Sequence, residues 1–97
     1  MASHPVDNVL RVVSEQFGVS VADIRSQRRT RTVHPARLWA AYLACMTTSE
    51  TFAAIGVRLG GRNENIIRMY ARNRANAVTD DAESARLFSQ LKAACRS

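Results

Sequence analysis

The apolar residues of this 97-residue chain recur at intervals of three and four along almost its whole length. That spacing is the period of an α-helix that buries one face, and no stretch alternates apolar and polar residues as a half-buried strand would. The pattern therefore predicts an all-α fold of six helices. Since no linker is long enough to separate two units, we expect residues 1–97 to form a single domain.

Capping residues, glycines and proline predict where each helix begins and ends. Small polar residues cap helix starts, proline fits a first turn, and glycine commonly follows a last turn. By these signals we expect a first helix near 6–17, ended by Gly18, and a second from Ser20, with Asp23, to about Gln27. A third helix is expected from Pro35 to the Thr-Thr-Ser run at 47–49, and a fourth near 52–59, ended by Gly60-Gly61. Asn63 is expected to cap the fifth helix, and Asp80 with Glu83 to begin the sixth, over 80–95. Leu38, Trp39, Tyr42, Leu43 and Met46 are expected to place the third helix against the core.

The basic residues are concentrated in two segments of the chain. Ten of the fourteen lie within 25–37 or 58–74, whereas only one of the eight acidic residues, Glu64, does. Thirteen of the fourteen are arginine, whose planar guanidinium offers paired donors to phosphate or guanine. A net charge of +6 with its surplus in two patches is typical of a nucleic-acid-binding protein. The alternatives are a solvated or membrane-attracted basic face and, for the arginine bias, a GC-rich genome.

The segment 52–74 has the form of a helix-turn-helix. A short helix is followed by a Gly-Gly turn and by a second helix that begins with small polar side chains. The first turn of such a second helix lies closest to the major-groove floor, where amides bond adenine and a carboxylate accepts from cytosine. The candidate DNA contacts in this motif are Arg62, Asn63, Glu64, Asn65, Arg68 and Arg72. The alternative is an ordinary helical hairpin in which Asn63 is only a cap and Glu64 pairs with Arg68.

A basic loop without acidic residues precedes the third helix. Its arginines and threonines, Arg28, Arg29, Thr30 and Arg31, occupy a segment that we expect to be extended. Such an arm can follow phosphates and place one guanidinium in the minor groove, whose narrow form attracts arginine. The alternative is a flexible, solvated loop.

Patterns of catalysis and metal binding are missing from the sequence. No glycine-rich nucleotide loop occurs, and His4 and His34 are isolated from any metal-ligand spacing; His34 is expected to cap a helix or lie near phosphate. Cys45 and Cys95 stand among apolar neighbours and are expected to be buried thiols. No signal peptide, transmembrane run or lipidation motif is recognised. We therefore expect a cytoplasmic, nucleoid-associated protein that is not an enzyme, needs no metal or cofactor, and binds neither membrane nor a small-molecule substrate.

Five short runs of residues occur in a specific order and spacing. They are Phe17–Ile24, Ser26–Val33, Pro35–Arg37, and Ala54–Gly56 followed by Leu59–Arg62. Together they resemble, over about 6–78, the C-terminal DNA-binding domain (domain IV) of the bacterial replication initiator DnaA. The resemblance implies a Trp-repressor-like helix-turn-helix fold in which the basic loop places an arginine, here Arg29, in the minor groove. It also implies that Arg37 binds the DNA backbone.

The chain departs from that family at the residues with which the family reads its DnaA box. The family signature Arg-Asp-His-Thr-Thr-Val is here Arg62-Asn63-Glu64-Asn65-Ile66-Ile67, and a backbone-contacting lysine is here Cys45. We therefore expect a double-stranded DNA-binding protein that regulates replication initiation or transcription without specificity for the box. The alternative is an adaptor that keeps the fold and binds a protein of the replication-initiation machinery.

Overall fold

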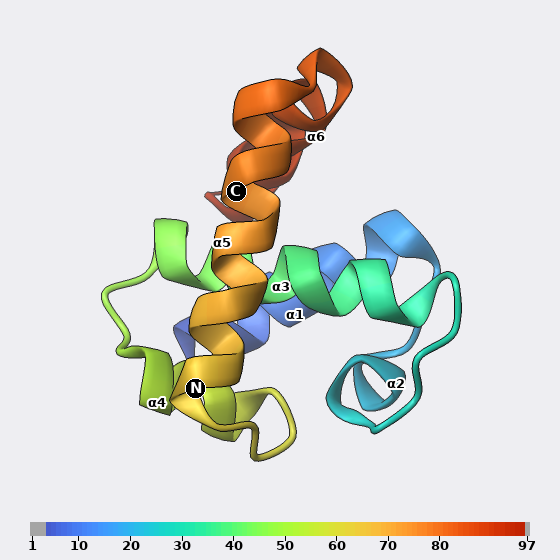
Figure 1. The fold of residues 1–97 in the computed structure, drawn as a ribbon. Coiled ribbons are helices and arrows are strands. Elements are labelled where there is room, and N and C mark those ends of the chain that lie inside the picture. The colour runs from blue at the N-terminus through green and yellow to red at the C-terminus, as the bar shows by residue number, and fades with distance from the viewer. Residues whose placement is uncertain (1–3, 97) are drawn as a thin grey trace.

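The computed structural model of this chain describes residues 4–96, and within them it contains six α-helices and no strand (Figure 1). The helices are α1 Pro5–Phe17, α2 Val21–Arg25, α3 Val33–Thr47, α4 Phe52–Arg58, α5 Glu64–Asp80 and α6 Ala82–Cys95. The predicted all-α class and the number of helices are confirmed.

The helices are arranged around α3, which runs through the middle of the molecule in Figure 1. α5 crosses α3 in front and α1 packs behind it, while α6 returns along the upper part of α5. α4 and α2 lie at the lower left and lower right of this view, on the two sides of the N-terminal end of α5. The loop that joins α2 to α3 and the turn that joins α4 to α5 are therefore on the same side of the fold.

The core forms around α3 because this helix is apolar on nearly every face. Its residues from Ala36 to Ala44 are all buried, and Arg37 is the one charged residue among them. The neighbouring helices supply Val9, Leu10 and Val13, Ile24, Ile55, Ile67 and Leu91. The predicted burial of Met46 is wrong: the side chain is 53% exposed, because the last turn of α3 borders an open groove.

The predicted caps account for most helix ends. The side chains of Ser20 and Asn63 accept hydrogen bonds from first-turn amides of α2 and α5, and Gly18 ends α1 in the left-handed conformation. Three boundaries differ from the sequence prediction. α3 begins at Val33, two residues before the expected Pro35. α6 is capped by Asp81 rather than begun by Asp80, because the Asp81 carboxylate accepts from the amides of the first turn and α5 continues to Asp80. α2 ends at Arg25, two residues before the expected Gln27.

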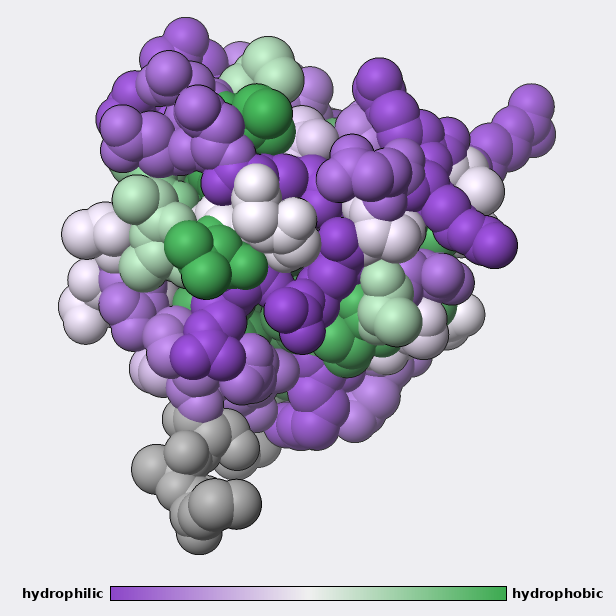
Figure 2. All heavy atoms as spheres, turned by 90° about the horizontal axis from the view of Figure 1, so that it is seen from below, coloured by the Kyte–Doolittle hydropathy of each residue, from purple (hydrophilic) through white to green (hydrophobic). Residues whose placement is uncertain are grey.

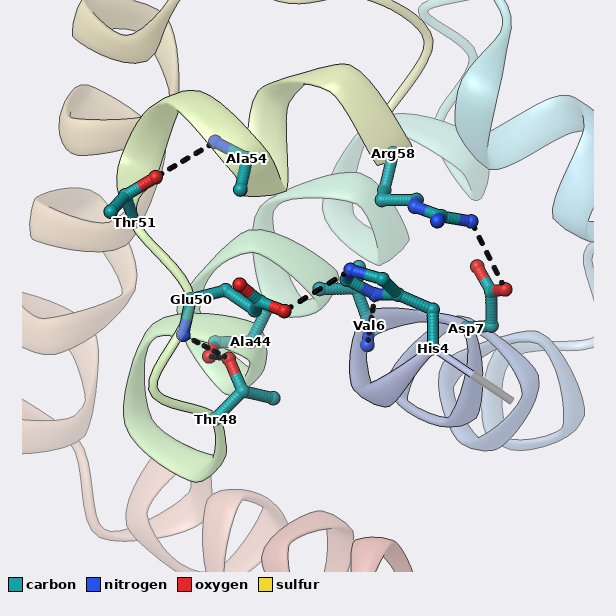
Figure 3. A network of polar contacts seen from close by, with 9 residues as sticks. All are labelled: His4, Val6, Asp7, Ala44, Thr48, Glu50, Thr51, Ala54 and Arg58. Carbon is teal, nitrogen blue, oxygen red and sulfur yellow. Dashed lines mark hydrogen bonds and ion pairs between the residues drawn. The ribbon is translucent and has the colours of Figure 1, made fainter. Parts of the chain in front are cut away.

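The N-terminal end of α1 is fastened to α4 and to the segment before it (Figure 3). The His4 ring caps α1 by accepting from the Val6 amide, and its Nε2 lies 3.1 Å from a Glu50 carboxylate oxygen. Arg58, in the last turn of α4, donates to the Asp7 carboxylate across 3.3 Å. These contacts connect the start of α1 to α4 and to the segment before it.

The two cysteines are free and partly buried. Burial raises the pKa of Cys45 to about 11 and also raises the pKa of Cys95. Both thiols are therefore protonated at neutral pH. None of the helices in residues 4–96 combines the length and the hydropathy needed to cross a membrane.

Candidate nucleic-acid interface

A glycine-dependent turn sets the angle between α4 and α5. Gly60 and Gly61 both have positive φ, at 82° and 78°, a region that side chains with a Cβ rarely enter. The amides of Gly61 and Arg62 donate to the Gly56 carbonyl at 3.0 and 2.8 Å. A Cβ at Gly56 would overlap the Arg62 carbonyl, so the turn folds tightly against α4. This geometry confirms the predicted helix-turn-helix.

The first turn of α5 lies at the lower end of the molecule in Figure 1, next to α4. Asn63, Glu64 and Asn65 are all exposed, while Ile67 is fully buried and fixes the rotation of the helix. The Asn63 side-chain oxygen accepts from the Asn65 amide at 2.7 Å, so Asn63 caps the helix as predicted. The small polar side chains that we expected to face bases therefore lie on a rigid, solvent-facing helix end.

The long basic side chains of α5 lie behind that first turn. Arg68 donates to the Asn65 side-chain oxygen at 3.0 Å, and its guanidinium lies 5.0 Å from the centroid of the Phe52 ring. The helical-hairpin alternative included an ion pair between Glu64 and Arg68. In the structure the Arg68 guanidinium contacts Asn65 and Phe52 instead. Arg72 is exposed one turn further along the same face.

The basic loop between α2 and α3 presents its side chains to solvent while its backbone is anchored at both ends. Arg28, Arg29, Thr30 and Arg31 are all exposed. The Thr30 hydroxyl accepts from the Val33 amide at 3.1 Å, and the Thr30 carbonyl accepts from the His34 amide at 3.0 Å. At the other end, the Arg28 amide donates to the Ser26 hydroxyl. These hydrogen bonds therefore hold the loop in place as an arm whose side chains are exposed to solvent.

Arg37 lies in the interior, where it joins the end of α2 to α3. Its side chain is 1% exposed, and its guanidinium donates to the carbonyls of Asp23, Ile24 and Ser26 at 3.1, 2.8 and 2.8 Å. The last carbonyls of a helix have no partner within the helix, and Arg37 supplies the donor of the buried Ile24 carbonyl. The Asp23 carbonyl also accepts from Ser26. The expected contact of Arg37 with DNA does not fit this burial, and the geometry gives the residue a positioning role.

Arg62 makes a second connection, between the α4–α5 turn and the start of the basic loop. It donates to the Leu59 carbonyl at 2.6 Å within the turn and to the Ser26 carbonyl at 2.6 Å. Ser26 thus accepts from both buried Arg37 and partly buried Arg62. A Cβ at Gly60 would overlap the Arg25 carbonyl, which shows how closely the turn approaches the end of α2. The arm and the helix-turn-helix are therefore fixed relative to each other.

A cleft of about 490 Å³ separates the basic loop from α5. Arg29 and Gln27 line one wall, and Asn63, Ile66, Met69 and Tyr70 line the other. Seen from below, this side of the molecule is mostly hydrophilic, with apolar atoms set between the polar ones (Figure 2). A basic arm and an exposed helix end thus lie on the two sides of a concave surface.

His34 lies behind this cleft. Its ring packs edge-on against Tyr70, with 6.2 Å between ring centroids, and its Nδ1 is buried without a partner among the described residues. Burial, and secondarily the nearby Arg29 and Arg37, lower the pKa of His34, so its imidazole is neutral at pH 7. The expected capping role is wrong, because Thr32 occupies the N-cap position of α3. The expected proximity of His34 to phosphate stays a prediction.

The burial of Arg37 is indicated by the spacing of apolar residues around it. Val33, Ala40 and Ala41 stand four residues before and three and four after it, and all three are buried apolar residues. Arg37 is thus on the buried stripe of its helix. The role of Arg62 had no such signal, since its partner Ser26 is 36 residues away in the chain.

The helix-turn-helix of the bacterial DnaA protein is the family whose model matches this chain, over residues 6–73. Similar proteins include the chromosomal replication initiator protein DnaA of Xanthobacter autotrophicus, which is 40% identical over 87 residues that make up 90% of this chain and 17% of the relative. The protein of the same name from Bartonella quintana is 37% identical over 90% of this chain and 18% of the relative. That from Pelobacter propionicus is 31% identical over 90% of this chain and 19% of the relative. The chain spans less than a fifth of the length of these relatives.

Proposed function

Since this chain belongs to the family of bacterial DnaA helix-turn-helix domains, we propose that it binds double-stranded DNA and regulates replication initiation or transcription. The basic loop occupies the minor groove, and the N-terminal end of α5 occupies the adjacent major groove. One observation supports this proposal above others: the Ser26 carbonyl joins Arg37 and Arg62, which holds the arm and the helix end on the same side of the fold. In this proposal the chain acts at the nucleoid, by binding and not by catalysis.

The proposal divides the exposed residues into two kinds of DNA contact. Arg28, Arg29 and Arg31 on the loop, with Arg68 and Arg72 on α5, supply charge to phosphates and to the minor groove. Asn63, Glu64 and Asn65 face base edges, with Thr30 supporting the loop. Arg37 and Arg62 do not contact bases, because their guanidinium groups are bonded to backbone carbonyls.

The two kinds of contact give different results when they are removed. Arg29→Ala and Arg31→Ala should weaken binding to all sequences, because phosphate contacts carry little sequence information. Asn65→Ala or Glu64→Ala should instead change the preferred sequence, by about 1–3 kcal/mol at one or two base pairs. Binding-site selection from a random duplex library measures both effects.

Arg86→Ala is the matched control, because Arg86 is exposed on α6, outside the interface. It should leave both affinity and preferred sequence unchanged. If wild type, Asn65→Ala and Glu64→Ala all selected the same sequences, the first turn of α5 would be a capped helix end that reads no bases.

Affinity for the DnaA box should be close to affinity for a random duplex. The three box-reading positions of the family are here Asn63, Glu64 and Asn65, and a polar group left unpaired at a base edge is penalised. Each mismatched contact costs about 1–3 kcal/mol, so two or three changes remove most of the specific free energy. Competition between a box duplex and a scrambled duplex measures the ratio of the two affinities. A preference for the box of about 100-fold or more would contradict this expectation and make the chain a competitor of the initiator.

A protein-binding adaptor is the second candidate function. The changed reading residues favour it, as does an apolar groove of about 390 Å³ bordered by Tyr42, Met46, Phe52 and Ala75. The exposed arginines of the basic loop favour DNA. The absence of measurable DNA binding at low salt would favour the adaptor.

A further inference from the structure

The exposed face of α5 carries two large apolar side chains next to its polar first turn. Ile66 is 36% exposed and Met69 is 59% exposed. Single exposed apolar residues are ordinary on protein surfaces. These two, however, are neighbours three residues apart on one helix, and both line the cleft opposite Arg29. Their position, rather than their exposure alone, requires an explanation.

The packing of α5 fixes the direction in which these side chains project. Ile67 is fully buried against the core, and Asn63 caps the helix, so the helix has one rotation about its axis. Met69 is four residues after Asn65 and therefore shares its outward face. Ile66 stands between that face and the basic loop. A duplex whose major groove receives Asn65 therefore lies against the helix face that also carries Met69, with Ile66 beside it.

The chemistry of the major groove offers one apolar partner for such side chains. Base edges there present hydrogen-bond donors and acceptors, together with the C5-methyl group of thymine. An isoleucine or methionine placed against a polar edge would desolvate that edge without bonding to it, which is unfavourable. Placed against a methyl group, it removes apolar surface from water, which is favourable.

We infer that Ile66 and Met69 contact thymine C5-methyl groups in the major groove, and that the chain selects its sites partly by the positions of thymine. This inference rests on the proposed DNA binding and adds the base feature that α5 recognises. Because 5-methylcytosine carries its methyl group at the same place on the pyrimidine ring, it should satisfy the same contact when it lies in that position.

Substitution of thymine by deoxyuridine tests the inference, because it removes the methyl group and keeps every hydrogen bond of the base pair. The probe is a short duplex with the sequence that wild-type protein prefers in site selection, with each thymine replaced in turn. We expect a loss of affinity of about three- to fivefold at one or two positions, the value of burying one methyl group. Deoxyuridine at the remaining positions should have no effect.

Met69→Ala and Ile66→Ala identify the side chains responsible. Each should bind the thymine duplex more weakly and lose the discrimination against deoxyuridine at its own position. Met46→Ala is the matched control, since Met46 is similarly exposed, at 53%, but lies on α3 outside the cleft. It should keep the full discrimination. All three variants should unfold within about 3 °C of wild type, as expected for exposed positions.

Three results would overturn the inference. Wild type could select no preferred sequence, could bind uridine and thymine duplexes equally at every position, or could show a discrimination that both α5 variants retain. In each of these cases DNA binding itself, and the proposed function, would stand. If no duplex bound at low salt, the proposed function would fail and this inference with it.

Discussion

Replacing Arg37 with alanine is expected to lower the free energy of unfolding by about 3 kcal/mol, the largest stability effect of any arginine in the two basic segments. The side chain is buried, and its guanidinium donates to three backbone carbonyls at the end of α2. Alanine leaves the buried Ile24 carbonyl without its donor, whereas the carbonyls of Asp23 and Ser26 lose one donor each and keep their bonds from Ser26 and Arg62. Urea unfolding followed by the helical circular dichroism signal measures the change.

Arg31→Ala is the matched control for Arg37→Ala. Arg31 has the same side chain and lies in the same basic segment, but it is exposed, so its removal should change stability by no more than about 0.5 kcal/mol. The free energy of unfolding of Arg37→Lys should lie between those of Arg37→Ala and Arg31→Ala, because an ammonium keeps the charge but cannot reproduce the fixed fork of donors. Equal stability of Arg37→Ala and Arg31→Ala would contradict the positioning role of Arg37.

The helices and their caps could be predicted from the sequence because they depend on neighbours. Ser20, Gly18 and Asn63 each act on amides or carbonyls within a few residues, so local composition was sufficient to place them. The predicted boundary between α5 and α6 was wrong by one residue, because Asp80 and Asp81 are adjacent and either side chain can cap a helix. Only the packing of the last turn of α5 decides between them.

The sequence was sufficient to predict which segments form the interface, but not which of their arginines face solvent. The basic loop and the Gly60-Gly61 turn are visible as sequence patterns. Whether an arginine faces solvent or a carbonyl depends on which chain segments meet, and Ser26 meets Arg62 across 36 residues. The resemblance assigned Arg37 to DNA and the helix-turn-helix pattern assigned Arg62, but both guanidinium groups donate to backbone carbonyls of the protein. Ile66 and Met69, which the composition did not single out for binding, lie in the cleft.

Binding of the chain to duplex DNA should depend strongly on salt. Six arginines of the two basic segments are exposed, namely Arg25, Arg28, Arg29, Arg31, Arg68 and Arg72. If about five of them neutralise phosphates, the logarithm of the association constant should fall against the logarithm of salt concentration with a slope of about −4 to −5. Between about 50 and 200 mM salt the affinity should therefore fall by a factor of roughly 10² to 10³.

Fluorescence anisotropy of a labelled duplex, titrated with the purified chain at several salt concentrations, measures this slope. We expect a slope of about −4 to −5 for wild type and a slope about one unit shallower for Arg29→Ala. Arg86→Ala, changed outside the interface, should keep the wild-type slope. No detectable binding at about 50 mM salt, or binding that does not weaken as salt is raised, would contradict the claim that this chain binds DNA through its arginine loop and helix-turn-helix.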